Sequence, residues 1–413
     1  MLFRSKSIPI NYRPISLTCI VCKLLEHIIC SNLSSHLELN GIITSRQHAF
    51  RRHHSRVTQL CTVIHDWTSA IDAGFQTDVF ILDFAKAFDT APHERLNAKL
   101  FHYGINGNTL HWIDAFLCYR RQRVLINGAK SEWIPVSSGV PQGTVLGPIL
   151  FNVFTNDIVD NINSDIRLFA DDCVCYRQIC SHEDHIALQK DIHHLGDWAQ
   201  RWNMRFEPSK CKIMHISRKT HHKSHYLYSL QNTALDSVTH TKYLGVTITN
   251  DLRWNRHVAN ITCKANQMLG LLRRNLSACD PALKEAAYMS LVRPLIEYAS
   301  CAWDPHTDQL IAEVEKIQRR AARFVLSDYE SYEPGSMSMM LKKLGWPPLK
   351  PRRRMDRVIL FNKGLNNLAS LPFLESLKKP TRRSRHTHCE HYIPLSARTN
   401  LHKYSFLPKT LTN

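Results

Sequence analysis

The sequence has no long apolar run. None of its apolar stretches approaches the ~20 residues that a membrane-spanning helix needs. Arg4 and Lys6 are followed by no apolar segment of the kind found in secretory signal peptides. These absences predict an intracellular protein, nuclear or cytoplasmic, that is neither secreted nor inserted in a membrane.

The 13 cysteines lack the spacing of a disulfide framework or of a zinc site. Cys19-x-x-Cys22 has no second C-x-x-C to complete a tetrahedral ligand set. Cys173, Cys175 and Cys180 have strand-like spacing, which predicts core thiols. Four further residues resemble metal ligands by type but are too crowded for a zinc knuckle: His386, His388, Cys389 and His391. We therefore expect a reducing compartment.

Acidic residues are scarce toward the end of the chain. Lys and Arg number 53 against 35 Asp and Glu, which gives a net charge of +18. Between Lys342 and Asn413 there are 16 basic and 3 acidic residues, so most of the excess lies in this stretch. The asymmetry fits a polyanionic partner, with nucleic acid ahead of an anionic membrane, and it fits a solvated basic surface equally well.

The chain does contain enough apolar material for a folded core. Apolar residues make up 44% and charged residues 21%, as is typical of folded proteins, and 413 residues allow two or three subdomains. Apolar periodicity predicts helices over 17–39, 57–73, 92–103, 109–119, 145–158 and 182–202, and mainly helices from 256 to 326. Strand patterns cover 78–84, 166–170, 173–177, 211–216 and 243–248. Asn127-Gly128 predicts a further hairpin.

Two short acidic segments lie within these apolar strand patterns. Asp83 ends the strand over 78–84, and Asp171-Asp172 lie at the tip of the hairpin between 166–170 and 173–177. An ionised carboxylate at the end of a buried strand is costly unless something compensates its charge. If the strands are neighbours, the carboxylates meet at one edge of the sheet. Such a cluster suits divalent cations, which bind hard oxygen ligands and support phosphoryl or nucleotidyl transfer.

Seven segments, in this order, resemble the motifs of the reverse transcriptase domain of non-LTR (LINE-type) retrotransposons. They cover most of the chain, and the resemblance extends from about Asn11 to Ser405. The segments are Asn11 to Leu17, Gln47-His-Ala-Phe-Arg51, Leu82 to Asp89, Ser138-Gly-Val-Pro-Gln-Gly143, Phe169-Ala-Asp-Asp172, Asn203 to Lys210 and Tyr243-Leu-Gly-Val246. Ala49 stands where the family usually has glycine.

The resemblance implies an α+β right-hand polymerase with fingers, an antiparallel-sheet palm and a helical thumb. It places the fingers in residues 1–75, the palm with inserted fingers elements in 76–250 and the thumb in 251–341. A basic C-terminal segment would occupy 342–413. The implied activity is RNA-directed DNA synthesis with two Mg²⁺ or Mn²⁺ ions, an RNA template, a DNA primer and dNTPs. The oligomeric state is left open.

The resemblance also assigns roles to individual residues. The implied metal ligands are Asp83 and Asp171, supported by Asp172, and Lys210 is a candidate for protonating or orienting the pyrophosphate. Phe88 would be the steric gate that excludes a 2′-hydroxyl. Contacts to the incoming dNTP are expected from Arg51, Phe84, Ala85, Phe88 and Gln142. The primer grip would comprise Tyr243, Leu244 and Gly245.

Several of these residues can also be interpreted as purely structural. Asp89 is better read as a capping or supporting residue than as a ligand. Arg51 and Lys210 could simply face solvent. The tryptophans are most simply packing residues: Trp198, Trp202 and Trp254. For the whole chain, the alternative function is a catalytically inactive, nucleic-acid-binding remnant, because an upstream endonuclease domain and a C-terminal Cys/His knuckle are expected to be missing.

Overall fold

The computed structural model describes residues 12–218, 226–380 and 392–412. Asn11 lies outside these ranges, as do four candidate metal ligands: His386, His388, Cys389 and His391. None of the helices within the described ranges is long and apolar enough to cross a membrane.

A five-stranded sheet of order β11-β8-β1-β7-β6 occupies the centre of the fold. Its central strand is β1 (Gln76–Asp83), which pairs antiparallel with both β7 (Asp172–Ile179) and β8 (Lys212–Ile216). Strand β6 (Asp165–Phe169) pairs antiparallel with β7, while the short β11 (Asp236–Ser237) runs parallel to β8. The predicted strands at 78–84, 166–170, 173–177 and 211–216 are thus confirmed within a few residues.

Alternating residues of the sheet enter two separate hydrophobic cores. Val79, Val174 and Tyr176 pack on one face with helix α2 (Arg56–Asp72). Phe80 and Cys175 pack on the other face, where α7 (His182–Arg201) covers the sheet. Since side chains alternate along a strand, Asp83 lies on the same face as Val79. The acidic end of β1 therefore opens toward the α2 side.

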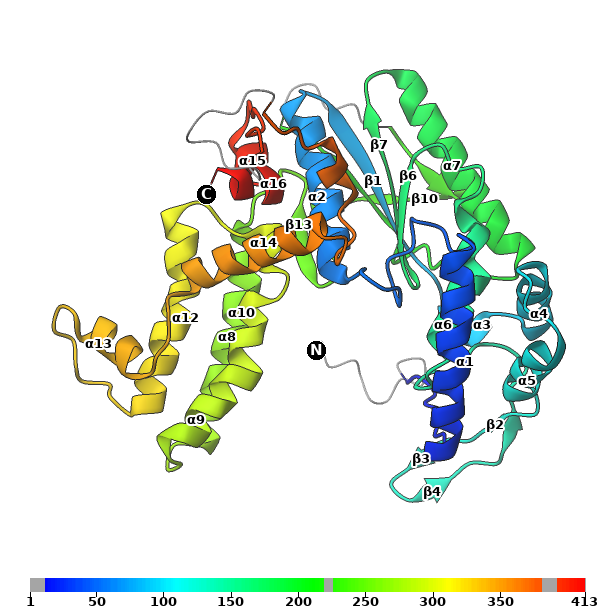
Figure 1. Ribbon diagram of the computed structural model, residues 1–413, viewed down its shortest axis with the longest axis horizontal. Helices are drawn as coiled ribbons and strands as arrows, with labels where there is room; N and C mark the ends of the chain where they lie inside the picture. The colour runs from blue at the N-terminus through cyan, green and yellow to red at the C-terminus, as the bar shows by residue number, and fades with distance from the viewer. Residues whose placement is uncertain (1–11, 219–225, 381–391, 413) are drawn as a thin grey trace.

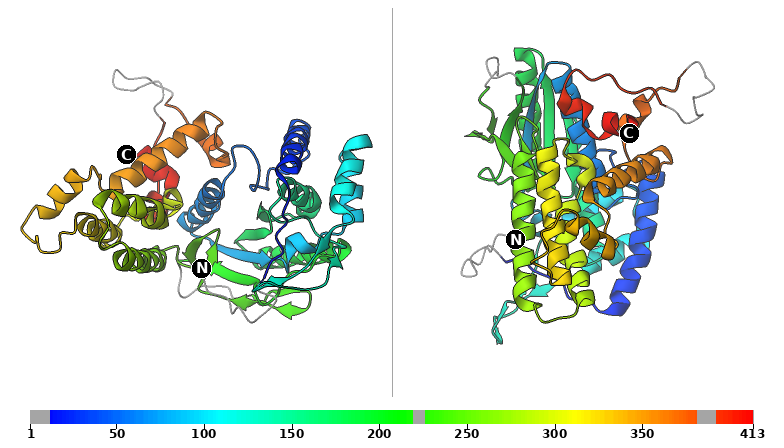
Figure 2. Two further views of the ribbon diagram at one scale, coloured as in Figure 1. Left: turned by 90° about the horizontal axis from the view of Figure 1, so that it is seen from below. Right: turned by 90° about the vertical axis from the view of Figure 1, so that its left-hand side faces the viewer.

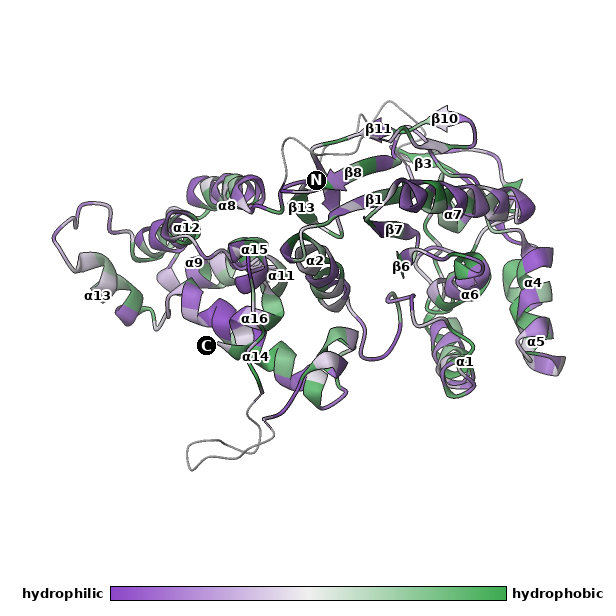
Figure 3. Ribbon diagram, turned by 90° about the horizontal axis from the view of Figure 1, so that it is seen from above, coloured by the Kyte–Doolittle hydropathy of each residue, from purple (hydrophilic) through white to green (hydrophobic). Residues whose placement is uncertain are grey.

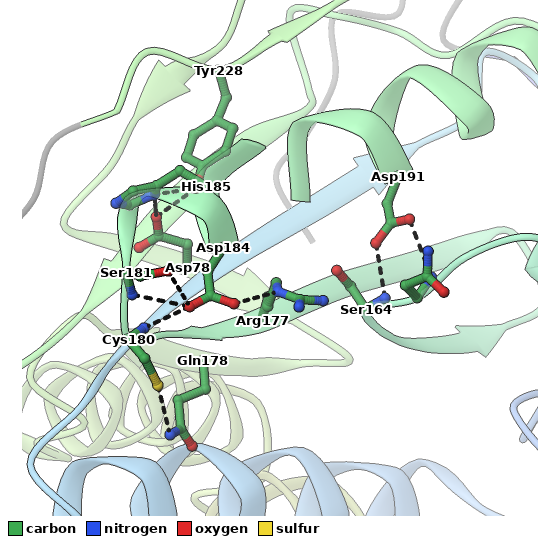
Figure 4. A network of polar contacts seen from close by, with 11 residues as sticks. Asp78, Ser164, Arg177, Gln178, Cys180, Ser181, Asp184, His185, Asp191 and Tyr228 are labelled. Atoms are coloured by element: carbon green, nitrogen blue, oxygen red, sulfur yellow. Dashed lines mark hydrogen bonds and ion pairs between the residues drawn. The ribbon is translucent and has the colours of Figure 1, made fainter. Parts of the chain in front are cut away.

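A buried polar network lies on the α7 face, away from that acidic end. Asp78 is fully buried in β1 and accepts hydrogen bonds from Tyr228 and Gln76 at 2.7 and 2.8 Å. His215 and His185 lie 2.8 and 3.2 Å from the same carboxylate. Figure 4 shows Asp78, His185 and Tyr228 at the start of α7. A buried carboxylate needs such partners, and here they join α7 to the sheet.

Helices and short hairpins surround the part of the sheet that carries β6 and β7, on the right in Figure 1. The helices are α1 (Ile20–Leu39), α3 (Ala87–Thr90), α4 (His93–His102), α5 (Gly107–Leu117) and α6 (Gly147–Thr155), with a 3-10 turn η2 (Asn156–Val159). The short strands are β2 (Arg121–Gln122), β3 (Leu125–Ile126), β4 (Ala129–Lys130) and β5 (Ile134–Pro135). β3 and β4 form the hairpin predicted around Asn127-Gly128.

A second body of helices follows the sheet in sequence and lies on the left in Figure 1 and in the left view of Figure 2. Its elements are α8 (Asn255–Asn275), α9 (Pro281–Ala287), the π-helical turn η3 (Tyr288–Val292), α10 (Arg293–Glu297), α11 (Ser300–Trp303), α12 (Asp308–Leu326), α13 (Ser336–Lys343), α14 (Leu349–Leu365), the 3-10 turn η4 (Pro372–Ser376), α15 (Asn400–Lys403) and α16 (Phe406–Leu411). Purple stripes on α8 and α12 in Figure 3 mark their hydrophilic sides.

The predicted strand over 243–248 is wrong, because the segment folds as a hairpin. Strand β12 (His240–Tyr243) pairs antiparallel with β13 (Val246–Thr249). Leu244 and Gly245 form the turn with φ of 44° and 90°. A two-residue turn with both φ values positive matches the right-handed twist of the flanking strands. An apolar run can therefore contain a turn. Two further short strands, β9 (Ser229–Leu230) and β10 (Thr233–Ala234), also pair.

Part of the C-terminal positive charge lies in the core. Arg353 and Arg357 of α14 are almost fully buried and both contact the buried carboxylate of Asp304, which Lys409 also contacts at 2.6 Å. The Arg353 Nε to Asp304 Oδ1 distance is 2.8 Å. These cations attach α14 and α16 to the segment after α11, so they belong neither to a solvated tail nor to a free polyanion-binding surface.

The thiol prediction is confirmed for two of three cysteines. Cys173 and Cys175 are buried in β7 as expected. Cys180 is exposed, because β7 ends at Ile179 and the chain turns into α7 there. Strand-like spacing predicts burial only as far as the strand extends.

Candidate active site

The predicted meeting of the acidic residues is confirmed by the register of the sheet. Asp83, the last residue of β1, lies directly opposite Asp172, the first residue of β7. Asp171 precedes it in the tight turn from β6. Opposite residues of an antiparallel pair have Cβ atoms ~4.5–5.5 Å apart and point to the same face. The carboxylates are therefore neighbours at one edge of the sheet.

Burial and neighbouring acidic charges perturb these carboxylates. Removal of water around the carboxylate, together with the charges of Asp171 and Asp83, raises the pKa of Asp172 to about 6, although its side chain stays accessible. Partial burial also raises the pKa of Asp171, with Asp83 adding to the shift and Arg13 and Lys210 opposing it. Clustered acids with raised pKa values are typical of functional sites.

Cations approach the acidic cluster from three segments. Lys210 Nζ lies 3.6 Å from Asp83 Oδ1, and both side chains are about half exposed. Arg56, at the start of α2, lowers the pKa of Asp172, and its guanidinium lies 5.4 Å from the centre of the Phe169 ring. The sequence reasoning missed Arg13 and Arg56. Arg13 lies within the opening motif, which could have indicated it; Arg56 carries no such signal.

The side chains within the described ranges form no assembled group of three or more metal-ligating residues. The three aspartates are adjacent but not closed around one point. Mg²⁺ is usually held by one or two carboxylates plus substrate phosphates and water rather than by an all-protein cage. Asp83 and Asp171 or Asp172 supply donors of that chemistry, so the residues present fit a divalent ion shared with a phosphate ligand.

The loop over 138–143 packs against the turn that follows Asp83. Gly139 N donates to Ala91 O at 2.8 Å, and Val140 N donates to Phe88 O at 2.7 Å. A Cβ at Gly139 would lie 2.7 Å from backbone atoms of Asp89, so only glycine allows this approach. The two segments predicted to cooperate are thus joined through their backbones.

Gln142 and Asp89 form a direct pair. Gln142 Nε2 donates to Asp89 Oδ1 at 2.6 Å, and Ser138 Oγ donates to Asp89 O at 3.0 Å. The supporting role expected for Asp89 agrees with these contacts. Gln142 was predicted to contact the nucleotide; here its amide nitrogen is bound to Asp89, which fixes the orientation of the side chain.

Helix α1 holds the other end of this loop. Glu26 is fully buried and its Oε2 accepts from Val145 N and Leu146 N at 2.7 and 3.0 Å. These amides precede α6, where backbone N–H groups lack partners within the helix. The sequence reasoning missed Glu26, although a lone acid in an apolar helical stripe is a signal for such a contact.

The aromatic residues predicted to contact the nucleotide differ in how far their rings are buried. Phe84 is buried and stacks on Phe206 with ring centres 4.3 Å apart, and Ala85 N donates to Arg205 O. Phe88 is half-buried and stacks on Phe151 at 4.4 Å. Phe88 can therefore present part of its ring, whereas the Phe84 side chain belongs to the core.

Arg51 is engaged within the protein. Its guanidinium forms a two-point ion pair with Glu38, with distances of 2.7 and 2.6 Å, and it also donates to Thr44 O. This pair lowers the pKa of Glu38. The solvent-facing alternative does not describe Arg51, whose side chain is 10% exposed. A triphosphate contact would require Arg51 to leave or share Glu38.

The β12–β13 turn docks against the helical body. Tyr243 is buried and bonded to Gln59 of α2, and Tyr298 Oη donates to Leu244 O at 2.8 Å. A Cβ at Gly245 would lie 2.9 Å from the Tyr298 ring. The three residues predicted as a primer grip thus lie at the junction of the sheet, α2 and the α10–α11 segment.

A mainly antiparallel sheet thus carries an acidic cluster at one edge and is flanked by two helical bodies. The family model described as reverse transcriptase (RNA-dependent DNA polymerase) matches residues 4–248. The chain belongs to this family, and the predicted α+β right-hand fold class is confirmed. The subdomain boundaries remain predictions.

Three of the curated relatives come from mobile elements of Drosophila melanogaster. The chain is 28% identical over 326 residues to a probable RNA-directed DNA polymerase from transposon X-element, covering 77% of this chain and 36% of the relative. It is 29% identical over 346 residues to one from transposon BS, covering 79% and 37%. For mobile element jockey the identity is 29%, covering 76% and 35%. The chain spans about a third of the length of these relatives.

Among solved structures, the chain is similar to telomerases. An apo telomerase from Candida tropicalis has a TM-score of 0.44 at 10% identity, covering 77% of this chain and 51% of that one. A telomerase from Candida albicans, in complex with a fragment of telomeric RNA, has a TM-score of 0.38 at 10% identity, covering 87% and 57%. Both likenesses are distant.

Proposed function

We propose that the chain is an RNA-directed DNA polymerase of the retrotransposon type, which adds dNTPs to a primer 3′-hydroxyl on an RNA template. The register that places Asp83 opposite Asp172, with Asp171 in the adjoining turn, carries the proposal. Family membership and the transposon relatives support it. The nuclear or cytoplasmic location stays a prediction from the sequence.

Divalent ions, two of Mg²⁺ or Mn²⁺ in the proposal, would be held by Asp83 and Asp171 with Asp172 in support. When bound, they would stabilise charge on the attacking primer oxygen and on the leaving pyrophosphate. The raised pKa values of Asp171 and Asp172 support this assignment, because burial and the neighbouring acidic charges both disfavour the ionised carboxylates, and a bound cation would offset both effects.

The chain's own residues would orient the reactants around that edge. The half-buried ring of Phe88, fixed against Phe151, would block a 2′-hydroxyl. Gln142, fixed by Asp89, would border the incoming nucleotide, beside the backbone at Phe84 and Ala85. Lys210 would reach the pyrophosphate from its position beside Asp83. Arg51 would bind the triphosphate by exchanging Glu38 for phosphate oxygens.

The second candidate function is a binding remnant without turnover. The sequence supports it through the positive segment after Lys342. Several of these positive charges are not available to a nucleic acid. Arg353 and Arg357 are buried against Asp304, and Arg352 is paired with Glu297 at 2.5 Å. The remaining exposed basic residues can still contact phosphates nonspecifically.

A primer-extension assay on RNA tests the proposal. Purified chain, a primed heteropolymeric RNA, Mg²⁺ and dNTPs are expected to yield DNA whose sequence is complementary to the RNA. Omission of the template should abolish the product. Binding that weakens steeply with salt, with no extension in Mg²⁺ or Mn²⁺, would favour the remnant instead.

A further inference from the structure

Gln47 connects the segment before Arg51 to the catalytic turn. It is 1% exposed, and its Oε1 accepts from Ala170 N at 3.1 Å and from Ala49 N at 3.0 Å. Ala170 immediately precedes Asp171. One neutral oxygen therefore bonds both its own loop and the turn that carries the acidic pair.

Ala170 has an uncommon backbone conformation for a residue with a side chain. Its φ is 56°, in the left-handed region. Such a conformation costs of order 1 kcal/mol and persists only where the surroundings fix it. The hydrogen bond from Ala170 N to Gln47 is a contact that fixes it, and the direction of Asp171 and Asp172 depends on this turn.

The backbone around Gln47 is itself anchored to the sheet. Leu168 of β6 donates to Arg46 O and accepts from His48 N, both at 2.9 Å, so residues 46–48 extend the sheet beyond β6. Asn152 Nδ2 of α6 donates to Ala49 O at 2.8 Å. Gln47 is thus held on two sides, as a fixed support requires.

The chemistry of the side chain also fits this position. A carboxylate could accept the same two bonds, but it would add a negative charge beside Asp171 and Asp172, which already repel one another. An aliphatic residue would leave two buried N–H groups without an acceptor. A neutral amide oxygen meets both conditions.

We propose that Gln47 is a positioning residue that holds the Ala170 turn, so that Asp171 and Asp172 face Asp83 and bind divalent cations. Its effect on polymerisation rests on the whole proposed function, whereas its effect on cation binding rests only on the proposed divalent site. Residues that orient metal ligands from the next layer commonly contribute about 10–100-fold to metal affinity or activity.

The test compares Gln47→Met with Gln318→Met, a matched buried glutamine of α12 whose Nε2 donates to Pro347 O. Mn²⁺ binding to protein alone is measured by electron paramagnetic resonance, and folding by thermal melting. Gln47→Met is expected to weaken Mn²⁺ binding about tenfold or more, and to lower kcat while the KM for primed RNA stays within about twofold. Gln318→Met should bind Mn²⁺ like the wild type.

A second change separates positioning from packing. Glycine adopts a positive φ without strain. Ala170→Gly in the Gln47→Met background is therefore expected to restore a large part of the Mn²⁺ affinity. If Gln47→Met does not fold, Gln47→Asn, whose amide is one methylene shorter, makes the same comparison.

A folded Gln47→Met or Gln47→Asn protein that binds Mn²⁺ as tightly as the wild type overturns the inference. Equal loss in Gln318→Met also overturns it, since the effect would then be a general consequence of losing a buried amide. If the wild type extends no primer while Gln47→Met still binds Mn²⁺ more weakly, the positioning inference is supported and the proposed function alone fails.

Discussion

Three carboxylates lie together at one edge of the sheet, those of Asp83, Asp171 and Asp172. In the helical body, by contrast, the single carboxylate of Asp304 contacts three cations. Within the described residues, the three aspartates at the sheet edge form one ion pair, between Asp83 and Lys210, and both of these side chains are about half exposed. Around Asp304, Arg353 and Arg357 are at most 2% exposed. The first centre has excess negative charge open to solvent; the second has excess positive charge sealed from it.

This difference between the two centres indicates which of them can bind a ligand and which one stabilises the fold. An accessible acidic excess can be relieved by a cation from solution, so it suits a reaction centre. A buried pair or cluster gains little net stability over apolar packing, but removal of one partner is strongly destabilising. The Asp304 centre therefore joins elements, while the Asp83 centre is available for binding. The following changes should separate these roles.

Asp171→Asn should have the largest effect on activity. We expect at least about a thousandfold loss of primer extension, which corresponds to about 4 kcal/mol, because a metal ligand is removed. Thermal stability should be unchanged or slightly higher, because one of the repelling charges is gone. Extension rates and melting curves of wild type and variant provide the measurement. If the variant unfolds, Asp171 stabilises the fold as Asp304 does, and the contrast between the two centres is wrong.

Asp304→Asn should have the largest effect on stability. Removal of the charge leaves Arg353, Arg357 and Lys409 without their shared anion, which should lower the free energy of unfolding by about 3–5 kcal/mol. Urea unfolding measures this. Asp236→Asn is the control, since its pair with Lys212 is on the surface and the Asp236 side chain is 76% exposed; a loss below about 1 kcal/mol is expected there. Equal losses would contradict the contrast.

Phe88→Ala should relax selection of the sugar. Loss of the ring opens space for a 2′-hydroxyl, so the ratio of ribonucleotide to deoxynucleotide incorporation should rise about tenfold or more. Single-nucleotide extension with each substrate gives this ratio. Phe101→Ala on the exposed side of α4 is the control. An unchanged ratio in Phe88→Ala would show that Phe88 is not the steric gate.

The pH dependence of stability should reveal the raised pKa of Asp172 without any metal. Its pKa is raised to about 6 in the folded chain, so the folded state binds more protons than the unfolded state between about pH 4 and 6. Stability therefore falls as pH rises through this window, and the loss is complete above it. In EDTA, Asp172→Asn should be more stable than wild type above pH 6, by about 1 kcal/mol because solvent screens the accessible group. An equal stability of wild type and Asp172→Asn at both pH 4 and pH 7 would contradict the raised pKa of Asp172.

Much of the fold and the position of the acids could be predicted from the sequence. Strand periodicity placed Asp83 and Asp171-Asp172 at strand ends, and the register joins them as expected. The Leu244-Gly245 turn was not predicted, because the apolar run around it also fits a continuous strand. Long-range partners had no local signal, as with Glu38 for Arg51 and Asp304 for Arg353. Charge counts cannot tell a buried arginine from a solvated one.

The most direct test of the acidic centre is the effect of Mg²⁺ on the melting temperature, at ionic strength matched with NaCl. A cation that binds the folded chain but not the unfolded chain stabilises the folded state by RT ln(1 + [L]/Kd). Mg²⁺ is expected to raise the melting temperature of wild type and of Asp236→Asn, and the rise is expected to disappear in Asp171→Asn. An equal rise in Asp171→Asn would contradict this expectation.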